Sequence, residues 1–134
     1  MELPDRAARR LKKNTIGWLT TVRQNGLPQT SPVWYLWDGD HELLVYSLAG
    51  TARTANIEAN PRVSFHLDSD GHGGDIVTLE GTAQIDGARP PANEAAAYVD
   101  KYKGYMNASG WTPDWFAGRY PVPLVIHIDR VRAH

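Results

Sequence analysis

The sequence predicts a mainly β domain, an antiparallel β-barrel of six strands with short helices inserted between them. Two observations predict this fold. Six segments have the alternation or the β-branched and aromatic composition of strands, and turn residues such as Asn25-Gly26, which tolerate positive φ, separate consecutive strands. Closing the six strands into a barrel also removes the exposed edges of an open sheet. The 134 residues suffice for one domain, residues 1–134, with its own core.

The strands are bounded by turns or by helical segments. We expect them at residues 16–22, 29–37, 42–48, 62–67, 76–85 and 122–131. The first three form a meander, because turn signals at 25–26 and 38–40 join them. Pro32 has no N–H for a ladder, so its strand should be an edge or be interrupted there. The last strand is apolar on both faces around Val125 and should be covered on both sides.

Four helical segments separate these strands. Apolar residues at helical spacing predict an amphipathic helix over residues 4–13. Thr51 is a suitable N-cap for a helix over 51–59, which Pro61 ends. Three-four spacing predicts a helix over 94–105, and Thr112-Pro113 begins a short one.

Composition excludes several classes of function. With no Cys, the chain has no disulfides, iron–sulfur clusters, Cys-based zinc sites or Cys nucleophiles. Fourteen basic and fifteen acidic residues give a net charge of -1, which argues against non-specific nucleic-acid binding. No apolar run approaches the roughly twenty residues that cross a bilayer, and the N-terminus lacks the apolar core of a secretory signal. We therefore expect a cytoplasmic protein that binds neither membranes nor nucleic acids.

The strongest candidate site is the junction of a strand and a helix at residues 47–56. Free backbone N–H groups open the helix, Thr51 adds a hydroxyl, and Arg53 adds a cation in the first turn. The helix dipole disfavours a cation at this end unless an anion intervenes. The junction therefore suits a phosphate; the alternative is a solvent-facing arginine on a surface helix.

Two aromatic groups are further candidates. Residues 32–37 carry three aromatic rings beside Pro32, where a flat ligand could lie against the strand, although such rings are also typical of a core or a subunit interface. Trp111, Trp115, Phe116 and Tyr120 would be a pocket wall or an interface if exposed, and core if buried. The polar segment 66–75 has neither calcium-loop nor zinc spacing, so we predict a hairpin loop and no metal.

Several short motifs occur in a characteristic order. They are Trp18-Leu19-Thr20-Thr21-Val22, Gly26-Leu27-Pro28, Pro32-Val33-Trp34-Tyr35, Gly50-Thr51-x-Arg53-x-x-Asn56-Ile57 and Asn60-Pro61-Arg62-Val63. This order, over residues 14–132, resembles the split β-barrel flavin and deazaflavin reductases related to pyridoxamine 5′-phosphate oxidase. The resemblance implies a six-stranded antiparallel split β-barrel that forms a homodimer, with two cofactor sites at the subunit interface.

The resemblance also implies which residues bind the cofactor. Residues 47–53 would hold its phosphate, through the Thr51 hydroxyl and the Arg53 cation, and the strand at 32–34 would lie along its ring. The implied cofactor-binding residues are Pro32, Val33, Trp34, Ser47, Thr51, Ala52, Arg53 and Asn56. No catalytic residue is predicted, although Tyr35 and Tyr120 are candidate proton donors.

The departures from the vitamin-forming oxidase favour a different cofactor. Thr51-Ala52-Arg53 has one cation fewer than the oxidase's flavin phosphate site, and Ser31 to Tyr35 are neutral where the oxidase is basic. The chain looks more like the branch that uses coenzyme F420 and passes a hydride to a conjugated, electron-poor small molecule. The F420 tail is anionic, so its groove would need cations such as Arg62, Lys101, Lys103 or Arg119.

Two alternatives remain open. One is an oxidoreductase that binds flavin mononucleotide (FMN), which ends at its phosphate. The other is a noncatalytic module that binds a flavin, a deazaflavin or heme, for which His66 and His127 are the candidate iron ligands.

Overall fold

The computed structural model describes residues 2–134. Its strands are β1 (Gly17–Val22), β2 (Pro28–Val33), β3 (Leu36–Trp37), β4 (Glu42–Ser47), β5 (Arg62–His66), β6 (Val77–Ile85) and β7 (Val122–Ala133). Its helices are α1 (Asp5–Lys13), α2 (Ala52–Ala59), α3 (Ala96–Ala108) and α4 (Pro113–Arg119), with a 3₁₀ turn at Ala92–Glu94 before α3. None of the helices in this described part is both long and apolar enough to cross a bilayer.

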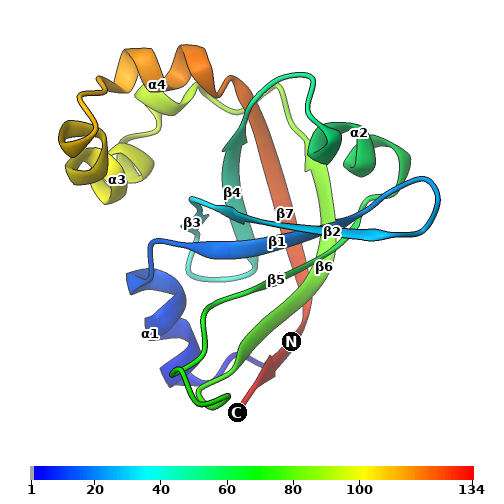
Figure 1. The fold of residues 1–134 in the computed structure, drawn as a ribbon. Helices are drawn as coiled ribbons and strands as arrows, with labels where there is room; N and C mark the ends of the chain where they lie inside the picture. Colours follow the sequence, from blue (N-terminus) through cyan, green and yellow to red (C-terminus); the bar gives the residue numbers. More distant parts are fainter. Residues whose placement is uncertain (1) are drawn as a thin grey trace.

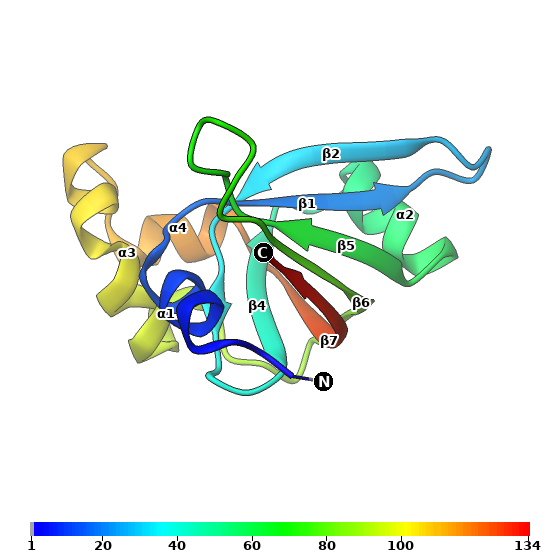
Figure 2. The ribbon, with the colours of Figure 1, turned by 90° about the horizontal axis from the view of Figure 1, so that it is seen from below.

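The seven strands form one antiparallel sheet in the order β2-β1-β5-β6-β7-β4-β3. The sheet curls, so that β1, β2 and β5 cross over β4 and β7 as half of a barrel (Figure 1). The prediction of a mainly β chain is corrected to a mixed fold, because helices hold 30% of the residues and strands 35%. The cause is that α3 and α4 pack together at one side of the sheet (Figures 1 and 2) and build a core of their own with β4.

The prediction of six strands is also wrong, because the segment 29–37 is broken at Trp34 and Tyr35 into β2 and β3. At this break, side chains of α3 form the hydrogen bonds to the backbone that a neighbouring strand would otherwise form. The Tyr35 N–H donates to the Tyr102 hydroxyl at 2.7 Å, and the Lys101 ammonium donates to the Tyr35 carbonyl at 2.8 Å. These bonds satisfy both backbone groups outside a strand. Pro32 itself lies within β2 and pairs with Trp18, and β2 is an edge strand of the sheet, so the edge position expected from Pro32 is confirmed.

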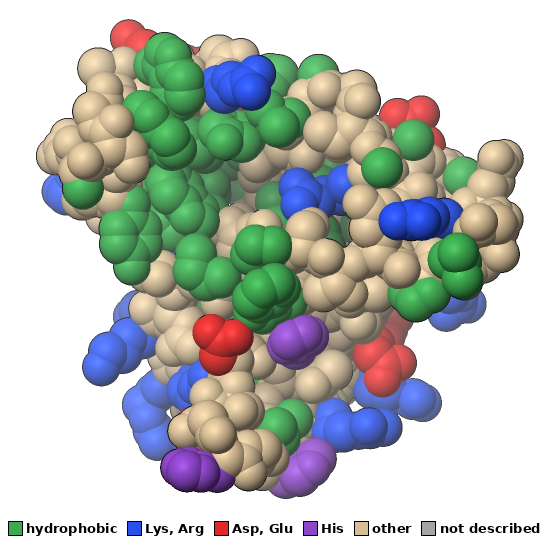
Figure 3. Space-filling model, in the orientation of Figure 1, with side chains coloured by type: hydrophobic (Ala, Val, Ile, Leu, Met, Phe, Trp, Pro, Cys, Tyr) green, Lys and Arg blue, Asp and Glu red, His purple; other side chains and the backbone are tan. Residues whose placement is uncertain are grey.

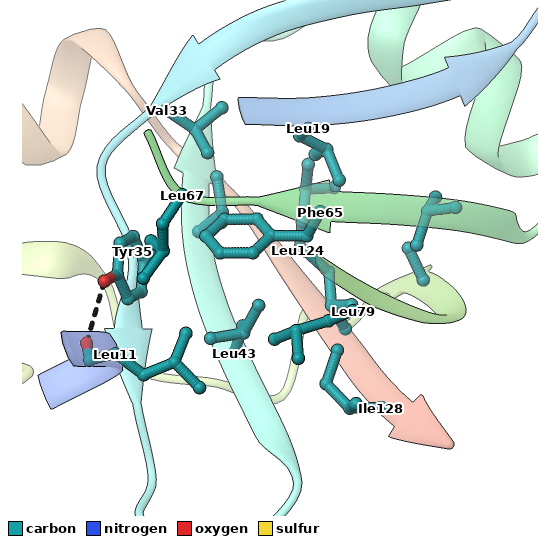
Figure 4. Packing of buried hydrophobic residues seen from close by; sticks show 14 of the residues in the cluster. Leu11, Leu19, Val33, Tyr35, Leu43, Phe65, Leu67, Leu79, Leu124 and Ile128 are labelled. Carbon is teal, nitrogen blue, oxygen red and sulfur yellow. Dashed lines mark hydrogen bonds between the residues drawn. The ribbon is translucent and has the colours of Figure 1, made fainter. Parts of the chain in front are cut away.

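The main core lies inside the curl (Figure 4). The Phe65 ring lies fully buried at the centre of this core. The Tyr35 ring packs against it edge to face, with 5.0 Å between the ring centroids. The Tyr35 hydroxyl donates to the Leu11 carbonyl at 2.8 Å, which ties α1 to the sheet. On β7, Val125 and Ile126 point to opposite faces and are both buried, as the two-sided apolar pattern predicted.

Candidate functional site

A cavity of about 340 Å³ opens between β2, β4 and the layer of α3 and α4. Its wall is mostly apolar and aromatic, with one charged side chain. The lining residues are Ile16, Pro32, Val33, Trp34, Tyr46, Leu48, Arg53, Tyr98, Trp111, Phe116 and Tyr120. In Figure 3, hydrophobic side chains gather over α3 and α4, and basic side chains lie at the hollow beside them.

Arg53 is the charged residue of this wall, and it is held by hydroxyls instead of carboxylates. Its Nη2 donates to Ser31 Oγ at 2.5 Å and its Nη1 to Ser47 Oγ at 3.2 Å. Its Nε is buried without a partner, and Arg53 is in none of the ion pairs found within residues 2–134. Burial lowers the pKa of Arg53, since desolvation penalises the charged form. A bound anion would pair this charge, so the residues fit a phosphate.

Thr51 lies at the edge of the same region. It is the N-cap of α2, and its hydroxyl accepts the Thr54 N–H at 3.4 Å, as predicted. Thr51 and Arg119 both line a second hollow of about 320 Å³, which shares Leu48 with the first. Two adjoining compartments thus exist, an aromatic one that contains Arg53 and a more open one beside Thr51 and Arg119.

The structure brings most of the predicted site residues together. Pro32, Val33, Trp34 and Arg53 line the cavity, and Ser47 holds Arg53. Ala52 is exposed in the first turn of α2. Asn56 is different, since its amide donates to Thr21 Oγ1 at 3.0 Å and to Gln29 Oε1 at 3.3 Å. The contacts of Asn56 therefore fix α2 on β1 and β2.

The aromatic wall is a series of stacked rings. The Trp34 ring stacks on Tyr102, with 4.6 Å between the ring centroids and 3° between the ring planes. It also stacks on Phe116, with a centroid distance of 5.3 Å and an interplanar angle of 11°. Phe116 in turn stacks on Tyr120 at 4.6 Å. Of the late aromatic cluster, Trp111, Phe116 and Tyr120 form cavity wall, whereas Trp115 is 47% exposed.

Leu48 belongs to the predicted junction 47–56, but sequence reasoning missed three other wall residues, namely Ile16, Tyr46 and Tyr98. Tyr98 and Tyr102 had a usable signal, because aromatic residues four positions apart share one face of a helix. Ile16 and Tyr46 stand beside or in strands with nothing unusual in their pattern.

The candidate cations for a cofactor tail are dispersed. Lys101 lies 3.8 Å from the centre of the Tyr35 ring, and burial lowers its pKa to about 8. Lys103 lies 3.6 Å from the Asp100 carboxylate, and Arg62 is exposed on β5. Arg119 alone of the four adjoins Thr51.

Of the two candidate proton donors, only one lies in the cavity. The Tyr35 hydroxyl is committed to Leu11 in the core, whereas Tyr120 lines the cavity.

Neither candidate heme ligand faces the cavity. His66 stacks on Trp18, with its Nδ1 3.0 Å from the Leu67 carbonyl, and His127 packs against His41. Residues 2–134 contain no group of three or more His, Asp or Glu side chains placed to hold a metal. His66 ends β5, and the rest of this segment, residues 67–75, is a polar loop as predicted, in which the Asp70 carboxylate accepts the N–H groups of His72 and Gly74.

The curled sheet and the site together define a split-barrel protein whose aromatic cavity contains a half-buried arginine that is in none of the ion pairs found within residues 2–134. The chain belongs to the pyridoxamine 5′-phosphate oxidase family, whose model matches residues 3–133. The resemblance seen in the order of motifs is thereby confirmed.

Solved structures share this fold. The conserved hypothetical protein Rv2991 from Mycobacterium tuberculosis is 23% identical, with a TM-score of 0.77 over 99% of this chain and 84% of that one. A protein described as an F420 reductase is 22% identical, with a TM-score of 0.73 over 97% and 98% of the two chains. HutZ, the heme storage protein from Vibrio cholerae, is 15% identical, with a TM-score of 0.67 over 99% and 95%. At these identities the likeness is one of fold.

Proposed function

We propose that this protein is an F420-dependent oxidoreductase that reduces a conjugated, electron-poor small molecule. The observation that carries the proposal is Arg53, a half-buried cation whose buried Nε has no partner, in the wall of an aromatic cavity. Removing part of a charge from water without an opposite charge is costly, and a ligand phosphate would pair with it.

The second compartment favours F420 over FMN. FMN ends at its phosphate, whereas F420 continues into an anionic tail. Beyond Arg53, the open hollow beside Thr51 and Arg119 offers this tail a hydroxyl and a second cation. The shared fold with a protein described as an F420 reductase supports the same choice.

In this proposal, the residues of the chain bind the cofactor and orient its ring. Arg53 and the first turn of α2 would hold the phosphate, and Pro32, Val33 and Trp34 would lie along the ring. When bound, reduced F420 supplies a hydride to the double bond of the acceptor, and a proton from solvent or from Tyr120 completes the reduction. The stacked wall of Trp34, Phe116 and Tyr120 keeps water from the ring.

The proposal includes a homodimer. Trp115 and Tyr105 are each 47% exposed on α4 and α3, and their rings lie 5.0 Å from Trp111 and 5.9 Å from Trp34, two residues of the cavity wall. Exposed aromatic groups of this kind are typical of subunit interfaces. Sedimentation at micromolar concentration should give a dimer, and a monomer would contradict this part of the proposal.

The heme alternative derives support from the shared fold of HutZ. It is less favoured because no histidine lines the cavity. A heme titration without a Soret shift would remove it.

Turnover tests the proposal. Chemically reduced F420 is mixed with the protein and with cyclohexenone, an electron-poor conjugated ketone, and the return of oxidised F420 absorbance is followed. We expect oxidation that scales with protein concentration and requires the ketone. A rate equal to that of the protein-free control, with cyclohexenone and with a panel of other conjugated acceptors, would contradict the proposed activity.

A further inference from the structure

Three buried side-chain polar atoms in residues 2–134 have no hydrogen-bond partner: Arg53 Nε, Asp75 Oδ1 and the Tyr98 hydroxyl. Asp75 is nevertheless ion-paired with Arg6, so its charge is compensated. The other two residues line the same cavity. Since buried polar groups are nearly always paired, two orphans in one cavity indicate a ligand with two polar groups.

An anion would pair with the Arg53 cation, whereas the neutral Tyr98 hydroxyl lacks a hydrogen-bond partner. Tyr98 is fully buried on α3, and its ring packs against Tyr46 at 4.9 Å and Tyr102 at 5.0 Å. Both of these neighbours have bonded hydroxyls, Tyr46 to the Pro90 carbonyl at 2.7 Å and Tyr102 to the Tyr35 backbone. Tyr98 is thus the one member of this tyrosine group whose hydroxyl lacks a partner.

The hydroxyl of Tyr98 is available as a donor. Burial raises the pKa of Tyr98 far above its ordinary value, so the hydroxyl stays protonated throughout the working pH range. The surrounding wall is aromatic and, apart from Arg53, uncharged. A flat conjugated ring fits such a wall, and the neutral acceptor that such rings carry is a carbonyl oxygen.

We propose that the Tyr98 hydroxyl donates a hydrogen bond to a carbonyl oxygen of a conjugated ring bound in the cavity. Tyr98 is then a specificity-determining residue that selects carbonyl-bearing rings over hydrocarbons of the same shape. This inference rests on the proposed function in one respect, since it uses the same cavity. The ring that carries the carbonyl belongs either to the cofactor or to the acceptor.

A matched pair of ligands tests the hydrogen bond without F420. Naphthoquinone and naphthalene have the same fused-ring shape, but only the quinone carries carbonyl oxygens. Their dissociation constants are measured by calorimetry for wild type, Tyr98→Phe and the control Tyr105→Phe, whose ring lies outside the residues that line the cavity. We expect wild type to prefer the quinone by about tenfold, Tyr98→Phe to lose that preference, and Tyr105→Phe to keep it.

The melting temperature of the ligand-free variants supplies an independent readout. Removing an unpaired hydroxyl should leave the melting temperature of Tyr98→Phe unchanged or raised, whereas Tyr105→Phe loses a hydrogen bond to Thr15 and should melt no higher than wild type. A wild type that binds the quinone no more tightly than naphthalene, or a Tyr98→Phe variant that keeps the preference, would overturn the proposal.

F420 affinity then assigns the carbonyl. A tenfold loss in Tyr98→Phe would place the hydrogen bond on the deazaflavin ring, and an unchanged affinity would place it on the acceptor. Failure of wild type to bind or oxidise F420 would refute the proposed function and leave the quinone result standing.

Discussion

Arg53→Met should raise the dissociation constant for F420 by roughly tenfold to a hundredfold, because it removes a charge-assisted hydrogen bond worth about 1.5 to 3 kcal/mol. The ligand-free protein should melt at the same temperature or higher. Methionine fills a similar volume, and the substitution removes a half-buried cation whose contacts in the chain are the hydroxyls of Ser31 and Ser47.

Two further variants serve as controls for this result. Arg53→Lys should keep part of the affinity, as a point charge without the planar fork. Arg62→Met, on exposed β5 outside the cavity, should bind F420 as wild type does. If Arg53→Met lowered the ligand-free melting temperature and left F420 affinity unchanged, Arg53 would be a structural residue and the phosphate would bind elsewhere.

Gly81→Ala should cost about 3 kcal/mol of unfolding free energy, at the upper end for overpacking. A Cβ at Gly81 would overlap the His127 carbonyl oxygen and lie 2.8 Å from its carbonyl carbon. These are backbone atoms of the paired strand β7, at the register shift between Glu80 and Gly81, so they move only if the β6–β7 ladder opens.

Urea denaturation measures this loss against Gly87→Ala as the control. A Cβ at Gly87 meets no atom within 4 Å, so that variant should stay within about 0.5 kcal/mol of wild type. Equal midpoints for the two variants would show that β6 and β7 tolerate separation at Gly81.

Much of the fold was predictable because its signals are local. Gly26 adopts φ +87° in the predicted hairpin, and Thr51 and Thr112 cap the predicted helices with their own side chains. The break at Trp34 and Tyr35 was not predictable, since the competing partner of the Tyr35 N–H lies 67 residues away on α3. Tertiary contacts there override a strand-like composition.

One part of the candidate site was likewise predictable from local sequence, and the other part was not. The proposed anion-binding part was inferred from Thr51 and Arg53, because the N-cap hydroxyl and the first-turn cation of one helix are only two positions apart in the sequence. The proposed ring-binding wall joins β2, β4, α3 and α4, and the missing partner of Tyr98 becomes visible only once Tyr46 and Tyr102 surround it.

Fluorescence titration of the purified protein with F420 and, separately, with FMN tests the central claim most directly. We expect a dissociation constant in the micromolar range or tighter for F420 alone, because only F420 extends past the phosphate toward Thr51 and Arg119. Equal or tighter binding of FMN would contradict the cofactor assignment.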